Sequence, residues 1–267
     1  MDIEIRELST FEQFEEIASL QKKIWNLSDV DKISTITLKA LTMQYPIMGL
    51  VIGTYYDNQI IGFAICFPTR ETTTMYGLIM GVLPDFQNSD IGNRMGIKIL
   101  ELCLKQNITK ICWTFEPLEA IHGYLYLNKW GAVVVKYEQN YYQLKDEISK
   151  KLPLDRFIVD CNLQSNRVIE RINKKIEIRS PQKALNEFPI AQWNNLPNQK
   201  SVLVEIPQNF QLMKTNEIDK LIEYRKKTRI IFEYYITKQG YFIAEMISGE
   251  INGERHNYYL MEKRSFI

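Results

Sequence analysis

The chain has few of the residues on which metal sites and covalent cross-links depend. Its 267 residues include only two histidines, His122 and His256, and four cysteines, none of which forms a CxxC pair. A histidine-based zinc site and a disulfide framework are therefore not expected. Each cysteine lies among apolar neighbours, which is typical of buried free thiols in a reducing compartment.

Long apolar runs and an excess of charge of one sign are also lacking. The strongest apolar runs, residues 49–53 and 60–67, are far shorter than the roughly 20 residues of a membrane helix. The first ten residues, MDIEIRELST, are acidic and have no apolar core of a signal peptide. The net charge of +1 gives no support for a polyanion-binding protein. We therefore expect a cytoplasmic protein that binds neither nucleic acid nor membrane.

The sequence does contain an ordered succession of strand and helix patterns. Through residue 165 the apolar spacing predicts the order β-α-α-β-β-β-α-β-α-β-β. Strands that cluster in the middle, followed by two helical crossovers, predict a mixed sheet with helices on both faces. The predicted helices cover residues 11–25, residues 34–45, the segment after Gly92 and residues 118–129.

Residues 166–267 form a second region with a weaker pattern. The basic run from Arg167 to Arg179 is more typical of a solvated face than of a phosphate site. We find no internal repeat and no Gly/Ser linker, so we expect two domains, residues 1–165 and 166–267, that pack together. The expected elements of the second domain are strands over residues 201–207, 240–247 and 257–262 and a helix over residues 216–237.

A short polar loop joins one strand to a helix in the first region. Residues 81–106 read GVLPDFQNSDIGNRMGIKILELCLKQ: an apolar strand that ends at Pro84, a polar turn, and an amphipathic helix after Gly92. One interpretation is an ordinary strand–helix turn. The other is an anion site, because a helix N-terminus offers unpaired N–H groups and a partial positive charge.

The strand order and several motifs resemble the GNAT acyltransferases (GCN5-related N-acetyltransferases), and a GNAT-like family of about this length. The resemblance covers nearly the whole chain. It implies an α/β fold: a mixed, mostly antiparallel sheet of GNAT type with helices on both faces, plus a C-terminal α+β region. In that fold the strand before the central helix splays from its neighbour, and acyl-CoA enters the wedge. The motifs are WTFEPLEA at 113–120, WGAV at 130–133, NYY at 140–142, LPLDRFIVD at 152–160 and, more weakly, VEIPQNFQ at 204–211 and YRKKTR at 224–229.

The resemblance implies that the loop binds the pyrophosphate of an acyl-CoA co-substrate, acetyl-CoA or succinyl-CoA, without a metal. Gln87 and Gly92 match the ends of the GNAT loop pattern, but Asp90 stands where a glycine is expected. Aspartate tolerates positive φ moderately well. Its carboxylate would repel the pyrophosphate unless it turned outward, where a local hydrogen bond would order the loop. The expected cofactor-binding residues are Met80, Val82, Gln87, Asn88, Ser89, Asp90, Ile91, Gly92 and Asn93.

The resemblance also implies catalytic residues near the end of the next strand. Glu116 would take a proton from an incoming ammonium group, and it would equally cap the helix that follows. Many GNAT enzymes carry a general-acid tyrosine four residues before the glycine that ends this helix, but counting back from Gly131 reaches Leu127. Tyr126 would point about 100° away on an α-helix. Tyr124 is therefore the expected substitute, and core packing is the alternative for both tyrosines.

A third group of residues would recognise the acceptor. Arg156 would bind the carboxylate of an amino acid and Asp155 its ammonium group, or the two would serve in internal ion pairs. Tyr141 would line the rim of the acceptor pocket. Arg225 and Arg229 share a helix face and would pair with acids of the first domain.

The expected activity is acyl transfer from acyl-CoA to the amine of a small metabolite such as an amino acid. The amine would attack the thioester directly, while the backbone amide around Val82 polarised the carbonyl. A small-molecule amine acceptor is the expected partner, with a homodimer as a possibility. The alternative is a catalytically degenerate GNAT-like module that binds or regulates. Three departures from the family pattern argue for it: Asp90, Leu127, and Ala120, which stands where an asparagine is common near the start of the helix.

Overall fold

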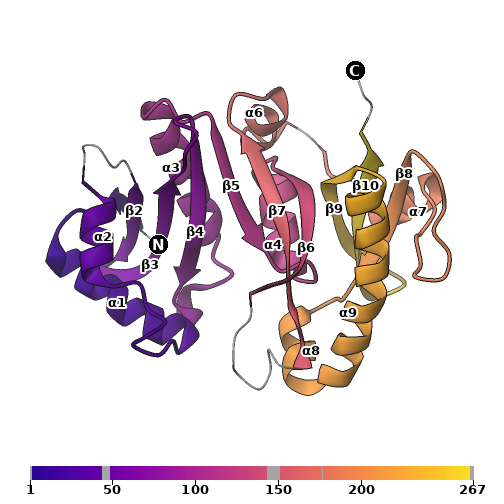
Figure 1. The fold of residues 1–267 in the computed structure, drawn as a ribbon, viewed down its shortest axis with the longest axis horizontal. Helices are drawn as coiled ribbons and strands as arrows, with labels where there is room; N and C mark the ends of the chain where they lie inside the picture. The colour runs from indigo at the N-terminus through magenta and orange to yellow at the C-terminus, as the bar shows by residue number, and fades with distance from the viewer. Residues whose placement is uncertain (1, 44–48, 143–150, 176, 265–267) are drawn as a thin grey trace. The chain divides into compact units, whose positions relative to one another are not determined.

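A computed structural model describes residues 2–43, 49–142, 151–175 and 177–264 (Figure 1). The chain forms two compact units, Met1–Trp113 and Thr114–Ile267. Among the described residues, no helix is long and apolar enough to cross a membrane. Both units combine helices with sheet, and antiparallel strand pairs outnumber the parallel pair. The predicted fold class, a mixed and mostly antiparallel α/β fold, is confirmed.

The first unit is a sheet with helices on both faces. Its strand order is β1-β2-β3-β4-β5, with β4 and β5 parallel and the other neighbours antiparallel. Helices α1 and α2 cover one face, where Phe14 and Leu38 join a cluster with Phe63. Helix α3 covers the other face, where Met95 lies against Gly62. The elements are β1 Glu4–Glu7, α1 Phe11–Trp25, α2 Thr35–Leu41, β2 Leu50–Tyr56, β3 Gln59–Pro68, β4 Thr74–Val82, η1 Pro84–Phe86, α3 Ile91–Lys105 and β5 Lys110–Phe115.

Short-range signals in the sequence set the ends of these elements. Thr10 and Gln13 form a capping box at the start of α1, and Asn26 ends that helix in the left-handed conformation. Asp57 and Asn58 have φ angles of 49° and 61°, as a two-residue hairpin turn between β2 and β3 requires.

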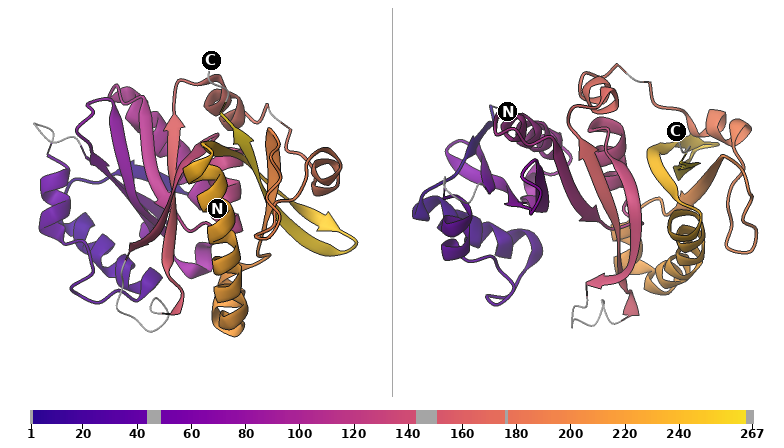
Figure 2. Two further views of the ribbon diagram at one scale, coloured as in Figure 1. Left: turned by 45° about the vertical axis from the view of Figure 1, so that its right-hand side comes forward. Right: turned by 45° about the horizontal axis from the view of Figure 1, so that its top comes forward.

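The second unit is an antiparallel sheet in the order β7-β6-β9-β10-β8, along which the long helix α9 is packed (Figure 2). Its core is aromatic. Phe157 makes edge contacts with Phe115, Tyr137, Phe232 and Tyr259 at centroid distances of 4.8–5.8 Å. The elements are α4 Ala120–Gly123, the π-helix η2 Tyr124–Lys129, β6 Val133–Tyr142, β7 Leu154–Asn162, α6 Asn166–Ile172, α7 Pro181–Glu187, β8 Ser201–Ile206, α8 Phe210–Asn216, α9 Ile218–Phe232, the π-helix η3 Glu233–Lys238, β9 Tyr241–Ile251 and β10 Glu254–Lys263.

The predicted succession of elements is present, with some differences in position. Helix α2 ends at Leu41, earlier than expected, and residues 44–48 lie outside the described residues. The short helices α6, α7 and α8 were not predicted. The units divide at Trp113, before the boundary expected at residue 165, because β6 pairs with β9 and so joins the C-terminal strands. All four cysteines are free thiols, and only Cys112 is partly exposed.

The basic run that begins at Arg167 is not the solvated face that its pattern suggested. Helix α6 directs Arg167 to the carbonyl oxygens of Gly131 (3.0 Å), Leu127 (3.2 Å) and Ala244. Arg171, one turn later, is only 6% exposed. The prediction of a solvated face was therefore wrong for Arg167 and Arg171, whereas Lys174 and Lys175 of the same run are exposed.

Gly131 and Gly240 both have positive φ, but only Gly131 has a crowded Cβ position. A Cβ on Gly131 would lie 2.9 Å from the Cα of Val168, whereas a Cβ on Gly240 would meet nothing within 4 Å. We expect Gly240→Ala to lower the free energy of unfolding by about 1 kcal/mol, the cost of a left-handed backbone with a Cβ. Gly131→Ala should lower it by about 2–4 kcal/mol, because the backbone of α6 must also move. Urea unfolding measures both values, and equal losses would contradict this account.

Candidate functional site

The ladder between β4 and β5 stops partway along both strands. Pairing runs from Thr74 with Lys110 to Gly77 with Trp113, and β4 then continues through residues 78–82. At the same point β4 has a bulge in its pairing with β3. Leu78 is the extra residue, because consecutive residues of β3 pair with Gly77 and Ile79. The two strands therefore part ahead of the polar loop, as the GNAT resemblance implies.

The exposed edge of β4 presents two backbone N–H groups. The amide of Leu83 donates to the carbonyl of Ile61 on β3 at 2.8 Å. Since N–H directions alternate along a strand, the amides of Met80 and Val82 point to the side away from β3. Within the ranges given above, neither amide has a hydrogen-bond partner.

Polar side chains of the loop bond to the loop itself. Gln87 Nε2 donates to the carbonyl of Val82 at 3.0 Å, and Ser89 Oγ donates to the carbonyl of Phe86 at 2.5 Å. Asn88 adopts a φ of 61°, in the left-handed region that asparagine tolerates. These side chains hold the shape of the loop, so the groups left to bind a ligand are backbone amides.

Asp90 occupies the left-handed position for which a glycine was expected. Its φ is 62°, and its carboxylate makes no capping hydrogen bond to the amides of α3. Asn93 Nδ2 donates to Asp90 Oδ2 at 3.2 Å, the local bond that an outward carboxylate would make. The amides of Ile91 and Gly92 have no hydrogen-bond partner among the described residues. The start of α3 is therefore an uncapped helix N-terminus, suited to an anion.

In the second unit, Glu116 is buried and already engaged. Its Oε1 accepts a hydrogen bond from the Leu118 amide at 2.9 Å and from Arg225 Nη2 at 2.5 Å. Arg225 is 1% exposed. The contacts fit the helix-capping interpretation, and they pair the carboxylate with a buried guanidinium.

Asp155 is fully buried and uses both carboxylate oxygens inside the protein. It accepts hydrogen bonds from Arg229 at 2.9 and 2.6 Å, from the Tyr137 hydroxyl at 2.5 Å and from the Asn140 amide at 3.0 Å. Arg225 Nη1 lies 3.7 Å away. This network matches the alternative given for Asp155, a role in internal ion pairs. It also confirms that Arg225 and Arg229 pair with acids of the preceding region.

Burial alone would raise the pKa of the Asp155 carboxyl. Hydrogen bonds from Arg229, the charge of Arg225 and the bonds from Tyr137 and Asn140 outweigh burial and hold that pKa below its ordinary value. Burial and the Asp155 charge raise the pKa of the Tyr137 hydroxyl, which therefore stays protonated as a donor.

Arg156 and Tyr141 lie at the end of the β6–β7 hairpin where the connecting loop joins the two strands. Arg156 Nε donates to Thr114 Oγ1 at 3.1 Å, and its guanidinium lies 5.3 Å from the ring centroid of Tyr142. Tyr141 is 42% exposed and makes an edge contact with Tyr142. Arg156 is half-buried and does not pair with Asp155, so it keeps donors for a ligand.

The π-helix η2 changes which tyrosine occupies the predicted general-acid position. The amide of Trp130 bonds to the carbonyl five residues before it, Leu125. In this wider turn Tyr126, five residues before Gly131, takes the place that α-helical counting assigned to Leu127. Leu127 is fully buried and Tyr124 is half-buried. The sequence carried no signal of the extra residue per turn.

Tyr126 has the surroundings of a proton donor. It stacks on His122 at a centroid distance of 5.5 Å and packs edge-on against Phe115 at 5.4 Å. Burial raises the pKa of its hydroxyl to about 12, so the group is protonated at neutral pH.

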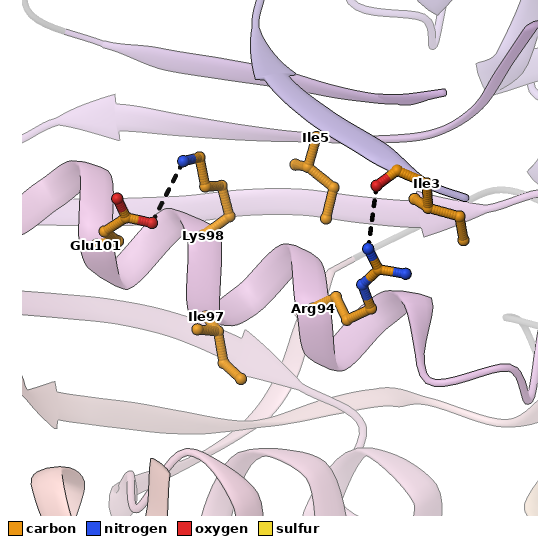
Figure 3. Close-up of a pocket in the computed structure, with 6 residues that line it drawn as sticks. All are labelled: Ile3, Ile5, Arg94, Ile97, Lys98 and Glu101. Atoms are coloured by element: carbon orange, nitrogen blue, oxygen red, sulfur yellow. Dashed lines mark hydrogen bonds and ion pairs between the residues drawn. The ribbon is translucent and has the colours of Figure 1, made fainter. Parts of the chain in front are cut away.

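Two cavities lie along helix surfaces, one in each unit. The first, about 300 Å³, lies between α3 and β1, and its polar groups bond to one another: Arg94 to the Ile3 carbonyl at 3.0 Å and Lys98 to Glu101 at 3.3 Å (Figure 3). The second, about 460 Å³, lies beside α9, and three of its four charged lining residues are basic. Its residues are Gln139, Leu196, Lys226, Arg229, Ile230, Glu233, Tyr234 and Lys238.

Residues 11–125 match the family model described as the acetyltransferase (GNAT) family. Solved structures of GNAT acetyltransferases share the fold. The N-acetyltransferase from Staphylococcus aureus Mu50 has a TM-score of 0.51 and 12% identity, over 61% of this chain and 100% of that chain. The ribosomal-protein-S18-alanine N-acetyltransferase from Escherichia coli has a TM-score of 0.50 and 15% identity, over 61% of this chain and 96% of that chain. No curated protein sequence matches the chain significantly.

The parted strands, the uncapped helix and these likenesses define an acetyltransferase class of fold. The match to the acetyltransferase (GNAT) family covers residues 11–125, which is less than half of the chain. At such low identities the solved structures show the fold and not the substrate.

We expect Asp155→Asn to lower the free energy of unfolding by about 3–5 kcal/mol, because two arginines lose their buried counter-charge. Asp160→Asn, in the same strand and half-exposed, is the matched control and should change it by less than about 0.5 kcal/mol. Urea unfolding at pH 7 gives both values.

The same pair of variants tests the pH dependence. The pKa of folded Asp155 lies below the unfolded value of about 3.9. Its stabilisation is therefore complete above that value and disappears as the pH falls through the folded pKa. The wild type and Asp160→Asn should lose stability between about pH 5 and 2 more steeply than Asp155→Asn. Parallel profiles would show that Asp155 is not held ionised.

Proposed function

We propose that the chain is an acyl-CoA-dependent N-acyltransferase that acts on the amine of a small metabolite such as an amino acid. The observation that carries this proposal is the exposed β4 edge followed by an uncapped helix N-terminus. Acyl-CoA supplies the activated acyl group and a pyrophosphate, and both of these need hydrogen-bond donors. Unpaired backbone amides lie at both places.

In the proposed complex each set of donors has its own task. The amides of Ile91 and Gly92 bind the pyrophosphate, and the loop side chains hold those amides in place. The amide of Met80 binds the pantetheine arm. The amide of Val82 polarises the thioester carbonyl, where negative charge develops as the amine attacks.

We assign the proton for the leaving thiolate to Tyr126 rather than Tyr124. Its hydroxyl is protonated at neutral pH, and the wider turn of the π-helix supports Tyr126, five residues before Gly131, as the counterpart of the general-acid tyrosine of the family. Arg156 is the proposed contact for an acceptor carboxylate, with Tyr141 at the rim. Glu116 positions the chain after β5 through its bonds to Leu118 and Arg225 and is not needed as the base.

Two features favour the alternative of a degenerate module that binds acyl-CoA without turnover. Asp90 puts a carboxylate in the loop, and Glu116 is neutralised by a buried arginine. Binding of acetyl-CoA together with no transfer to any amine would select this alternative.

Acetyl-CoA and succinyl-CoA should raise the melting temperature of the protein in a concentration-dependent way, since they bind only the folded state. Asp90→Asn keeps a residue that tolerates positive φ and removes one negative charge beside the pyrophosphate. We expect it to tighten acetyl-CoA binding about 3–10-fold in calorimetric titration at low ionic strength. Asp85→Asn, an equal charge change in η1, is the control and should have a smaller effect. No heat and no thermal shift in the wild type would refute the proposal.

Transfer is tested with acetyl-CoA or succinyl-CoA, the twenty amino acids and an alanine-initiated peptide, by detecting the released thiol. Tyr126→Phe should slow transfer about 100-fold or more, as the loss of a general acid does, while the acetyl-CoA thermal shift stays. Tyr124→Phe should retain most of the rate. The reverse result would return the role to Tyr124.

A further inference from the structure

The hairpins β6–β7 and β9–β10 have the same pairing register over residues 133–138 of β6 and 242–247 of β9. In each, a bulged residue interrupts the ladder at the same place, Val135 in β6 and Ala244 in β9, and β6–β7 alone has a further register shift between Glu138 and Tyr142. Corresponding residues of β6 and β9 lie a constant number of positions apart, as do those of β7 and β10. The corresponding pairs are Val133–Asp160 and Phe242–Glu262, Val134–Val159 and Ile243–Met261, Lys136–Ile158 and Glu245–Leu260, Tyr137–Phe157 and Met246–Tyr259, and Glu138–Arg156 and Ile247–Tyr258.

The segments that precede the two hairpins correspond as well. Each is a helix that ends in a π-helix of six residues, η2 and η3. In both, an amide bonds to the carbonyl five residues back, from Trp130 to Leu125 and from Gln239 to Tyr234. A glycine with positive φ follows each π-helix at the same spacing. Because π-helices and bulges are both uncommon, their repetition at matching positions indicates that the two segments are copies of one unit.

The two segments are related by a local two-fold axis. The strand order in this part of the sheet is β5-β7-β6-β9-β10-β8. Strands β6 and β9, β7 and β10, and β5 and β8 correspond, so the order in the second half is the reverse of that in the first. The halves join where Val134 pairs with Ile243 in antiparallel fashion. Val134 and Ile243 occupy equivalent positions in the two segments. A residue that lies at a two-fold axis must contact the equivalent residue of the other copy, as these two do.

The helices cross over this axis and pack on the other hairpin. Helix α9 of the second segment places Phe232 against Phe157 of β7, at a centroid distance of 4.8 Å. Gly123 of the first segment lies against Tyr259 of β10, whose hydroxyl would be 2.7 Å from an added Cβ. The packing is thus reciprocal, as between the two subunits of a symmetric dimer.

The second segment differs from the first in one respect that bears on the site. Its helix α9 is 15 residues long, whereas α4 has four. The added turns carry Arg225 and Arg229 to Glu116 and Asp155. Asp155 in turn accepts from the Asn140 amide, which ties the end of β6 to the start of β7 beside Arg156.

We propose that the C-terminal segment is a second copy of the segment that contains β5, α4, β6 and β7, and that it acts as a partner built into the chain. It occupies the β6 edge and supplies Arg229 as a positioning residue for the acceptor end of the first copy. Arg229 acts through Asp155 to set the ends of β6 and β7, between which the proposed acceptor contacts Arg156 and Tyr141 lie. The positioning role rests on the proposed function, and the repeat does not.

The test compares full-length Arg229→Gln and Arg229→Lys with the control Lys227→Gln, which removes an exposed charge from the same helix. Arg229→Gln should raise the KM for the best amine of the panel about tenfold and change kcat less than about threefold, because it disturbs acceptor placement and not the chemistry. Arg229→Lys should restore part of the loss, and the acetyl-CoA thermal shift should be unchanged throughout. An unchanged KM in folded Arg229→Gln overturns the positioning role.

Acid unfolding, followed by tryptophan fluorescence, gives a readout that needs no acceptor. The groups that face Asp155 are Tyr137 and Asn140 from β6 and Arg225 and Arg229 from α9. Removing Arg229 lets the pKa of Asp155 rise, so the acid midpoint should move to higher pH in Arg229→Gln and stay in place in Lys227→Gln. An unmoved midpoint overturns the pairing across the two copies. If the wild type transfers acyl groups to no amine, the proposed function and the positioning role both fail, whereas the midpoint still decides the pairing.

Discussion

The proposed chemistry depends on the point at which the β4–β5 ladder stops. A sheet normally pairs its backbone groups, and unpaired ones invite either water or another chain. Here the bulge at Leu78 coincides with the last pair, Gly77 with Trp113, and the edge beyond carries amides that face away from β3. Those amides have hydrogen-bonding capacity that the fold does not use. A ligand with carbonyl groups along an extended arm would use it.

In the polar loop the side chains stabilise the turn and the backbone amides remain available for a ligand. Gln87 and Ser89 bond to carbonyls of the loop, and Asp90 accepts from Asn93, so the side chains stabilise the turn. The amides at the start of α3 stay uncapped. Asp90 is thus compatible with the left-handed turn, although it adds a negative charge near the position proposed for a pyrophosphate. Its effect on a bound pyrophosphate is therefore electrostatic, because the shape of the loop is unchanged.

The second unit depends on buried ion pairs. Burying Arg225 and Asp155 costs desolvation energy that apolar residues would avoid, so such pairs contribute to a specific arrangement more than to stability. The arrangement in this protein joins α9 to the ends of β5, β6 and β7. With a repeated segment on the far side of a local two-fold axis, the chain holds within itself a contact that a symmetric dimer makes between subunits. The solved GNAT structures match about 60% of the chain, so the rest of the chain has no equivalent in them.

Much of the fold was predictable because its signals are local. The capping box at Thr10, the Asp57–Asn58 turn and the apolar spacing of α3 act within a few residues, and the motifs around Trp113 and Gly131 carried the superfamily resemblance. The candidate site was predictable in its loop, where the residues are consecutive. It was not predictable at Tyr126, because the extra residue per turn of a π-helix leaves no mark in the apolar pattern.

The repeat was invisible for a similar reason. Register, bulge and π-turn recur through backbone hydrogen bonds, while only Tyr126 with Tyr235, Lys129 with Lys238 and Gly131 with Gly240 keep their identity along the π-helical turns. The sequence by itself determined the class of fold, the polar loop and the left-handed turn at Asp90, because each rests on neighbours in the chain. Only the tertiary structure decided that Asp155 and Glu116 are bound by Arg229 and Arg225. Their partners lie on α9, far away in the sequence, and the role of a buried carboxylate depends on the charged groups that surround it.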